Sequence, residues 1–400
     1  MQYFPCYQPI IDINRMSIAG YEALARTRAS DGRVISIGAM FSDPSFNRRD
    51  LLAIDRSVRE QALAYFAKSQ QDVFLSLNLS PEWMDHVADT MPVPTLEMAK
   101  KWGVDPTRVL IEFVEGAGDN KNMQKLLARY RAAGMRIAID DFGSGFSHLD
   151  RIIALEPDII KLDMNLFKRA MAGGVSQEVV QSISYLARRT GSKLLCEGVE
   201  TEQEFYFALE CGARYVQGYF FWPALPEFID SDSPKGIIRG LLDGFVARNI
   251  DREKQRMRYM EEMALYFHLV QSALKGNILE FENLSAAPDG FLRVFLCRHN
   301  GEQISPNYDL ADDVDKRTWL VDQENYGSNW SMRPYFYQAM AAKQLQQKNQ
   351  VASAPYRDVR SGRLCQTIGK VLSGDRILFA DIMCFGEDDK DSHGNRFYLR

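Results

Sequence analysis

Short β-rich runs alternate with longer helical stretches through roughly the first 225 residues of the chain. Alternation of this kind predicts a largely parallel sheet. Eight candidate strands in a segment of this length fit a closed (β/α)8 barrel better than an open sheet. A short Asp-Ile-Asn-Arg turn joins the first two runs and predicts a hairpin, so one barrel strand is expected to run antiparallel. The candidate strands are Tyr3–Ile10, Ser17–Leu24, Val73–Leu79, Val109–Val114, Met135–Ile139, Ile159–Leu162, Lys193–Cys196 and Tyr215–Phe221.

The pattern changes at the sequence DSDSP, residues 230–234. A long helical stretch with few breakers follows, and after it come β-rich runs joined by turn-rich connections, which indicate a small α+β domain. We therefore expect three parts, namely a barrel over residues 1–229, a helical connector over 230–276 and a second domain over 277–400.

Composition excludes several classes of protein. The net charge is −5, from 48 basic and 53 acidic residues, so a basic surface for long nucleic acid is not expected. No apolar run reaches the length of a transmembrane helix, and the N-terminus lacks the basic and apolar regions of a signal peptide. The six cysteines form no C-x-x-C pair and are expected to be reduced thiols. We therefore expect a cytoplasmic protein.

Acid or amide side chains lie at or near the carboxyl ends of six of the candidate strands, and Lys161 lies in a seventh. A single carboxylate in such a position is usually a helix cap or a surface ion pair. In a parallel barrel, however, these ends share the face that carries active sites, so the side chains are expected to converge. The set comprises Glu22, Asn78, Glu112, Asp140, Asp141, Lys161, Glu197 and Gln217.

Five carboxylates would meet in this pocket, where like charges at close range repel and raise each other's pKa. Hard divalent cations with oxygen ligands resolve that conflict, and the five histidines show no zinc-binding spacing, so Mg²⁺ or Mn²⁺ is expected. Two ions about 3.5–4 Å apart would suit hydrolysis of a phosphate ester. Lys161 either supplies a cation beside the attacking water or forms a structural salt bridge to Asp163 or Glu197; its spacing fits both interpretations.

Seven motifs in order along residues 1–227 resemble the EAL-domain family of cyclic di-GMP phosphodiesterases. The signature Glu22-Ala23-Leu24 continues into Ala25-Arg26, as the extended motif E-A-L-x-R requires. A lone E-A-L tripeptide has no diagnostic value, whereas seven ordered motifs are specific. The other six are Tyr7-Gln8-Pro9-Ile10, Leu77-Asn78-Leu79-Ser80, Asp140-Asp141-Phe142-Gly143-Ser144-Gly145-Phe146-Ser147, Lys161-Leu162-Asp163, Glu197-Gly198-Val199-Glu200-Thr201 and Gln217-Gly218-Tyr219.

The resemblance implies a role for each matching residue. Lys161 and Glu197 would position and deprotonate the attacking water and, with Glu22, form the catalytic set. Glu115 would anchor the Asp-Asp-Phe-Gly loop. The reaction implied is the opening of cyclic di-GMP to linear pGpG. The first metal ion would be held by Glu22, Asn78, Glu112 and Asp140, and the second by Asp140, Asp141 and Glu197. The implied substrate contacts are Gln8, Leu24, Arg26, Asn78, Asp141 and Gln217.

The sequence departs from the family pattern at Val114, where Thr is frequent, and at His148, where a small Ser is common. Neither departure removes a metal ligand. Many family members that lack ligands only bind the dinucleotide, so a non-catalytic effector or scaffold is the alternative to an active enzyme. A different metal-dependent barrel enzyme is a third interpretation. The resemblance also implies a homodimer that forms through a barrel–barrel contact near the Asp-Asp-Phe-Gly loop.

The C-terminal segment resembles PAS- or Cache-like sensory domains, which in such proteins regulate the catalytic domain. The cues lie around Trp330 and in the residues that follow it. An Arg with aromatic side chains can hold a small anion or an amino acid as an unidentified signal, whereas core aromatics with a surface Arg would explain the same residues. The possible ligand site comprises Arg333, Tyr335, Tyr356 and Asp381.

Overall fold

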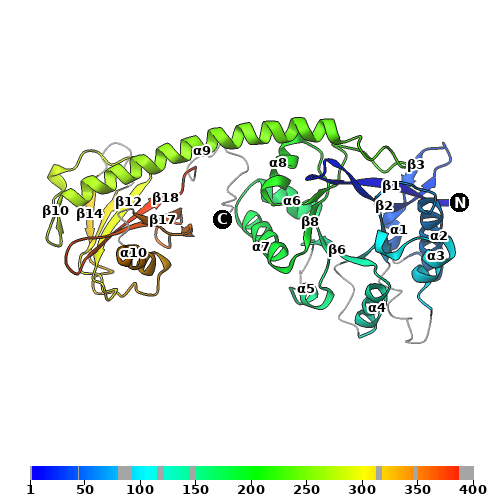
Figure 1. Cartoon of the computed structure of the whole chain (residues 1–400), viewed down its shortest axis with the longest axis horizontal. Coiled ribbons are helices and arrows are strands. Elements are labelled where there is room, and N and C mark those ends of the chain that lie inside the picture. Colours follow the sequence, from blue (N-terminus) through cyan, green and yellow to red (C-terminus); the bar gives the residue numbers. More distant parts are fainter. Residues whose placement is uncertain are drawn as a thin grey trace. The chain divides into compact units, whose positions relative to one another are not determined.

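The computed structural model describes residues 2–43, 45–79, 92–114, 121–144, 149–311, 318–345 and 350–386 (Figure 1). The chain divides into two compact units, Met1–Phe245 and Val246–Ser392. Among the helices of these described ranges, none is both long enough and apolar enough to cross a bilayer.

Eight strands of the first unit form a closed ring. Following the hydrogen-bonded neighbours gives the order β1-β9-β8-β7-β6-β5-β4-β2, and β2 pairs back onto β1. β1 is antiparallel to both of its neighbours, while the other adjacent pairs of the ring are parallel. The predicted barrel and its single antiparallel strand are thus confirmed. The strands are β1 (Tyr3–Asp12), β2 (Ser17–Arg28), β4 (Phe74–Leu79), β5 (Val109–Val114), β6 (Arg136–Phe142), β7 (Ile159–Leu162), β8 (Lys193–Cys196) and β9 (Tyr215–Val216), and β3 (Val34–Ser36) pairs with β2 outside the ring.

β9 is shorter than the run Tyr215–Phe221 that the sequence indicates. The chain leaves the sheet after Val216 because Gly218 lies directly against the backbone of Val199, where a Cβ atom would come within 2.0 Å of the Val199 carbonyl oxygen. The backbone amides of Val199 and Phe220 donate to Gln217 and Val199, respectively, and hold the turn.

Helices connect most of the parallel strands, and local sequence sets several of their ends. Thr201 and Glu204 form a reciprocal capping box at the start of α8, and Asp163 caps α6 through the Leu166 amide. Gly191 ends α7 in the left-handed conformation. The helices of this unit are α1 (Gly38–Ser42), α2 (Arg48–Phe66), α3 (Pro94–Trp102), α4 (Lys121–Ala132), α5 (Leu149–Leu155), α6 (Met164–Met171), α7 (Val175–Thr190) and α8 (Glu202–Glu210), with a 3-10 turn η2 at Pro106–Arg108.

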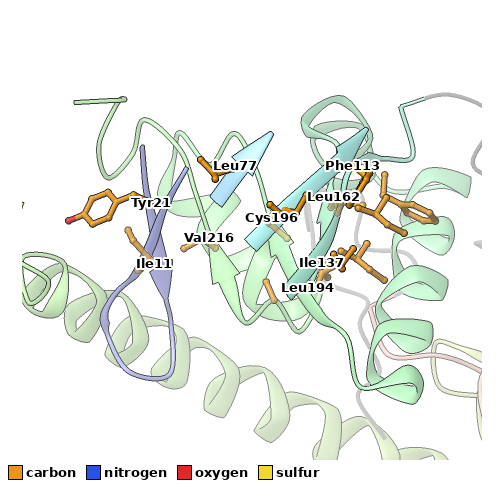
Figure 2. Packing of buried hydrophobic residues seen from close by; sticks show 14 of the residues in the cluster. Ile11, Tyr21, Leu77, Phe113, Ile137, Leu162, Leu194, Cys196 and Val216 are labelled. Carbon is orange, nitrogen blue, oxygen red and sulfur yellow. The ribbon is translucent and has the colours of Figure 1, made fainter. Parts of the chain in front are cut away.

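Alternate residues of the barrel strands build two apolar layers. One set packs against the surrounding helices and includes Ile137, Leu162 and Val216 (Figure 2). The other set forms a separate cluster with one residue from each of six strands, as expected for side chains that point into a small barrel. Its members are Ile10, Phe74, Leu110, Ala138, Ile159 and Leu195.

The long helix α9 (Lys235–Ser272) contains the boundary between the two units. Near its start, Ile238 and Leu241 belong to the core of the first unit. Near its end, Met263 and Phe267 belong to a core of the second unit. The helix therefore contributes apolar side chains to both cores.

The second unit is built on one antiparallel sheet in the order β14-β13-β12-β18-β17-β15, with β16 also paired to β17. The end of α9 packs on one face, against Leu296 and Leu378, and α10 (Pro334–Gln344) packs on the other, against Phe295 and Phe379. The strands are β10 (Leu274–Lys275) and β11 (Ile278–Leu279), which form a hairpin, and β12 (Phe291–Cys297), β13 (Asn307–Leu310), β14 (Trp319–Asp322), β15 (Val351–Ala352), β16 (Tyr356–Arg357), β17 (Leu364–Val371) and β18 (Ile377–Met383), with a 3-10 turn η3 at Phe281–Asn283.

Candidate metal centre

The polar residues of the barrel lie directly beyond its inner apolar layer. Side chains on a strand alternate between faces, so the second residue after an inward-pointing one also points inward. In β5 this step leads from Leu110 to Glu112, and in β6 it leads from Ala138 to Asp140. The same step gives Lys161 on β7 and Glu197 immediately after β8. The apolar layer thus closes the barrel beneath a ring of charged side chains.

Lys161 is the centre of this ring. Its side chain is 1% exposed, and its Nζ atom lies 2.7 Å from Asp140 Oδ1 and 2.7 Å from Glu197 Oε1. Glu112 Oε2 lies 3.0 Å away and Glu22 Oε2 3.4 Å away. A salt bridge to Glu197 is therefore present, while the described contacts of Lys161 include none to Asp163. One ammonium group is shared by four carboxylates.

Neutral side chains orient two of these carboxylates. Asn78 donates from Nδ2 to Glu22 Oε1 over 2.9 Å, and Gln217 donates from Nε2 to Glu22 Oε2 over 2.8 Å. Ser76 donates from Oγ to Glu112 Oε1 over 2.6 Å and is fully buried. Sequence reasoning missed Ser76, although its position two residues before Asn78 on β4 is a signal that both side chains face the centre.

The carboxylates form two groups that share Asp140. Ligand atoms of Glu22, Glu112 and Asp140 lie within 4.8 Å of one another, and so do those of Asp140, Asp141 and Glu197. Asp141 has a positive φ of 52°, a conformation that costs energy for a residue with a side chain. This conformation accompanies the turn of the chain out of β6 and keeps two successive acids in one site.

Burial and mutual repulsion shift the protonation of these acids. Burial, with repulsion from Glu22, raises the pKa of Glu112 well above its usual range. Burial raises the pKa of Glu197 to about 8 against the opposing effect of Lys161, and burial with repulsion from Asp140 raises the pKa of Asp141 to about 6. Burial also opposes ionisation of Glu22, but Lys161 and the amides of Asn78 and Gln217 lower its pKa overall.

The donor set fits divalent cations. Five carboxylates and the Asn78 amide supply oxygen atoms, the ligands that Mg²⁺ and Mn²⁺ prefer. Lys161 supplies one positive charge to the four carboxylates that it contacts, and ionising Glu112 and Glu197 is opposed by burial and by the neighbouring acids. A pair of cations would relieve this excess of negative charge.

The three predicted substrate contacts on β1 and β2 lie on the same face of the hairpin as Glu22. Gln8 is the cross-strand partner of Glu22, and Leu24 and Arg26 follow it at intervals of two residues. Gln8 donates from Nε2 to the Trp222 carbonyl over 3.5 Å. Arg26 donates to its neighbour's carbonyl at Ala25 and to Ser36 Oγ. Glu115, the predicted loop anchor, lies outside the described residues.

The four residues of the possible sensor site line one cavity of about 340 Å³ in the second unit. Tyr356 and Asp381 are in contact, because the Tyr356 hydroxyl donates to Asp381 Oδ1 over 2.9 Å. Sequence reasoning missed Arg293, whose guanidinium lies 3.3 Å from Asp381 Oδ2 in the same cavity wall. An arginine inside the apolar run FLRVFLC was the available signal.

Comparison with known families identifies two domains in the chain. Residues 2–224 match the model of the EAL domain, and the chain therefore belongs to the EAL-domain family. Residues 228–388 match the model of the EAL-domain associated signalling protein domain. The second match covers the sheet domain for which the sequence suggested a PAS- or Cache-like type.

Three similar proteins illustrate the relationship. YkuI of Bacillus subtilis, an EAL-domain containing protein, is 27% identical over 391 residues, which are 94% of this chain and 93% of YkuI. Its crystal structure in complex with substrate c-di-GMP and calcium superposes with a TM-score of 0.82 over 95% of this chain. The cyclic di-GMP phosphodiesterase PA2567 of Pseudomonas aeruginosa is 30% identical over 229 residues, but this match covers 39% of that protein. A calcium and cyclic di-GMP complex of Klebsiella pneumoniae BlrP1 matches 58% of this chain at 28% identity, with a TM-score of 0.51.

Proposed function

We propose that this protein hydrolyses cyclic di-GMP to linear pGpG with the help of Mg²⁺ or Mn²⁺, and that it acts in the cytoplasm. The observation that carries the proposal is the cluster in which one buried ammonium serves four carboxylates with a fifth beside them. Support comes from the family and from relatives that are named as cyclic di-GMP phosphodiesterases or contain cyclic di-GMP and calcium.

The two groups of acids define the proposed metal sites. Glu22, Glu112 and Asp140, with Asn78, would hold one ion, and Asp140, Asp141 and Glu197 would hold the other. When bound, such ions neutralise phosphate charge and stabilise the attacking and leaving oxygens of an in-line displacement. An acidic pocket could not otherwise admit a dianionic dinucleotide, because its carboxylates would repel the phosphates.

Lys161 and Glu197 are the residues that we assign to the attacking water. Glu197 Oε1 lies 2.7 Å from Lys161 Nζ, so the ammonium fixes the direction of this carboxylate. Without metal, burial raises the pKa of Glu197 to about 8, and bound cations would favour the ionised form that a general base requires. In the proposed step, water gives a proton to Glu197 and its oxygen forms a bond to phosphorus. The bond between phosphorus and the departing ribose oxygen breaks, and that oxygen takes up a proton, so that the products are balanced.

Gln8, Leu24 and Arg26 are proposed to contact the dinucleotide. They lie on the face of the β1–β2 hairpin that carries Glu22. The guanidinium of Arg26 would donate hydrogen bonds to a phosphate, and the side chain of Leu24 would pack against a base. Gln217, Asn78 and Asp141 would complete the contact with the metal-bound phosphate.

The test is a turnover assay on the full-length protein with Mg²⁺ or Mn²⁺, in which nucleotide products are separated and identified. Formation of pGpG supports the proposal. Saturable binding of cyclic di-GMP in the presence of metal, with no product over several hours, would reject hydrolysis and select the alternative of a non-catalytic effector or scaffold. Absence of both binding and product would reject the substrate class.

We also propose that two copies of the chain associate. Val246, Ile250 and Met257 on α9 are half exposed, at 54%, 50% and 55%. Their spacing places them on one side of the helix, where a second copy could cover them. Light scattering at working concentration tests the proposal, and a monomeric mass would contradict it.

Regulation by the second unit is a separate proposal. It rests on the match of residues 228–388 to a domain that accompanies EAL domains in signalling proteins. The expected result is a change in turnover when the second unit binds its ligand. Turnover that does not respond when that site is demonstrably filled would contradict regulation.

A further inference from the structure

The cavity of the second unit lies between the sheet and the segments that cross its α10 face. Its volume of about 340 Å³ is at the lower end of the range for small-molecule sites. The floor includes Arg293 on β12 and Asp381 on β18, and the walls include Trp330 and Tyr335 near the start of α10. A ligand here would meet aromatic walls above a charged floor.

The acids that line this cavity already have cationic partners. Asp358 Oδ1 and Asp381 Oδ2 each lie 3.3 Å from the Arg293 guanidinium. Glu324 pairs with Arg360. Asp381 also accepts hydrogen bonds from the hydroxyls of Tyr356 and Thr367. Each acid that lines the cavity therefore already has a guanidinium partner, and an ammonium ligand would have to compete with arginine for it.

Arg333 differs from Arg293 and Arg360, the other two cations of the cavity, in its contacts. Its described side-chain contact is with the face of the Trp330 ring, at 5.8 Å from the ring centroid. Within the described ranges, no carboxylate lies within salt-bridge distance of its guanidinium, in contrast to Arg293 and Arg360. Arg333 therefore has donors left for a ligand.

A buried amide adds a second free donor. Trp330 Nε1 donates to Gln303 Oε1 over 2.8 Å, and Gln303 Nε2 donates to Asn307 Oδ1 over 2.9 Å. This relay fixes which way the Asn307 amide faces. Asn307 is 1% exposed and lines the cavity, and its Nδ2 atom has no hydrogen-bond partner among the described residues. A buried amide donor without a partner is costly, so this atom is best explained by an acceptor that a ligand supplies.

We propose that this cavity binds a small organic monoanion, a carboxylate with a compact apolar body. The carboxylate accepts hydrogen bonds from Arg333 and Asn307, and the apolar body packs against Trp330 and Phe295. A guanidinium matches a carboxylate with two parallel hydrogen bonds, which neutral isosteres cannot reproduce. Burial also raises the pKa of Tyr335, so its hydroxyl keeps its proton and remains a donor at the cavity wall.

The test uses the full-length protein and a panel of matched small molecules, with binding followed by calorimetry. Phenylacetate, butyrate and acetate vary the body of the carboxylate, while phenylacetamide and phenethylamine replace the charge of phenylacetate by a neutral and a cationic group. We expect at least one carboxylate to bind saturably, and its amide to bind about tenfold or more weakly. The amine is expected not to bind.

Variants then locate the site. Arg333→Gln is expected to weaken binding of the carboxylate by about tenfold or more, and Arg333→Lys is expected to retain part of the affinity. Arg298→Gln is the matched control, because Arg298 is a half-exposed arginine of the same unit that pairs with Glu302 and does not line the cavity. Since Arg333 is exposed, its replacement leaves the core intact.

Three results would overturn the proposal. The first is that no carboxylate in the panel binds at about 10 mM. The second is that the amine binds as tightly as the matched carboxylate. The third is that Arg333→Gln binds the carboxylate with unchanged affinity. The cavity belongs to the second unit and the assay measures binding rather than turnover, so its outcome is independent of whether the barrel hydrolyses cyclic di-GMP.

Discussion

Each unit of this protein buries one cation among several acids, but the two clusters are completed in different ways. In the barrel, Lys161 has three N–H donors to share among four carboxylates. In the second unit, Arg293 has five donors for Asp309, Asp358 and Asp381. The first cluster has fewer N–H donors on its cation than it has carboxylates, whereas the second has more.

Neighbouring hydroxyl and amide donors increase this difference between the two clusters. In the second unit, hydroxyls of Tyr356 and Thr367 donate to Asp381, and Ser361 donates twice to Asp358. Asp309, Arg293, Asp381 and Thr367 form a cross-strand row over four neighbouring strands, so the sheet itself holds the network. A cluster whose carboxylates the protein supplies with hydrogen-bond donors serves structure, while one that it leaves short of donors is suited to binding cations.

The largest expected effect tests the barrel cluster directly. Glu22→Gln removes a charge that Lys161 and two amides hold in place, and should reduce cyclic di-GMP turnover by at least about 10⁴-fold, as loss of one member of a catalytic group does in other enzymes. Product formation is the measurement. Glu60→Gln on α2 is the matched control, because Glu60 is partly exposed and pairs with Lys101, and its turnover should not change. Undiminished turnover in Glu22→Gln would contradict the assigned site.

A second experiment compares the two cations. Lys161→Met and Arg293→Met should each lower the free energy of unfolding of their own unit by about 3–5 kcal/mol, because buried carboxylates lose their counter-charge. Added Mg²⁺ or Mn²⁺ should restore stability to Lys161→Met but not to Arg293→Met. Hydrogen exchange reports on each unit separately. An equal response of both variants to metal would remove the distinction between the clusters.

The third prediction concerns pH. Metal binding must expel the proton from Glu197, whose pKa is about 8, and below pH 6 also the proton from Asp141. The apparent affinity for Mn²⁺ should therefore rise by up to about tenfold per pH unit for each proton released. The contribution of Glu197 should level off above pH 8, and Glu112, whose pKa is also raised, should add to the slope. Titrations of the full-length protein at several pH values would show this. A pH-independent affinity would mean that these acids are already ionised in the metal-free protein.

The same pKa shift predicts the opposite trend for stability without metal. A folded carboxyl with a raised pKa holds its proton where the unfolded one has lost it. The free energy of unfolding should therefore fall as the pH rises from the unfolded pKa of Glu, about 4.3, to about 8. Thermal unfolding in the presence of a chelator checks the sign.

The smallest effects come from two hydroxyls that donate to buried acids. Ser76→Ala removes the donor to Glu112, and Tyr356→Phe removes one donor to Asp381. Each should cost about 1–3 kcal/mol in stability. Only Ser76→Ala should also weaken metal binding, by roughly 10–100-fold, as loss of outer-shell partners of a metal site does. Equal metal affinities in both variants would show that Ser76 has no role in orienting Glu112.

The sequence predicted the barrel because few other folds accommodate an alternation of short strands and helices of this length. It also predicted that the acids lie on one face of the barrel, because the carboxyl ends of its parallel strands form that face. It did not predict that Lys161 contacts Glu22, Glu112, Asp140 and Glu197 together, because those distances depend on how β2, β5, β6, β7 and β8 curve around the ring. The end of β9 was also misplaced, because it depends on the close approach of Gly218 to Val199, a tertiary contact between the segments that follow the neighbouring strands β9 and β8.

In the second unit, the aromatic and acidic cues predicted residues of one cavity but not its central cation. Arg293 lies in an apolar run that reads as an ordinary buried strand. Its role follows from the register, in which Arg293 is opposite Asp309 on one side and Asp381 on the other. Register between distant strands is a property of the whole sheet, and a single run does not encode it.

The antiparallel strand that closes the barrel has a consequence for biosynthesis. β1 leaves the ribosome before the other strands of the barrel, yet its second partner is β9, and Tyr7 also exchanges backbone hydrogen bonds with Leu225. Until that later segment is made, one edge of the β1–β2 hairpin has no partner and is open to pairing with other chains. Ring closure must therefore wait for nearly the entire first unit, so slowed translation within it would prolong the exposure of this edge and favour aggregation of the nascent chain.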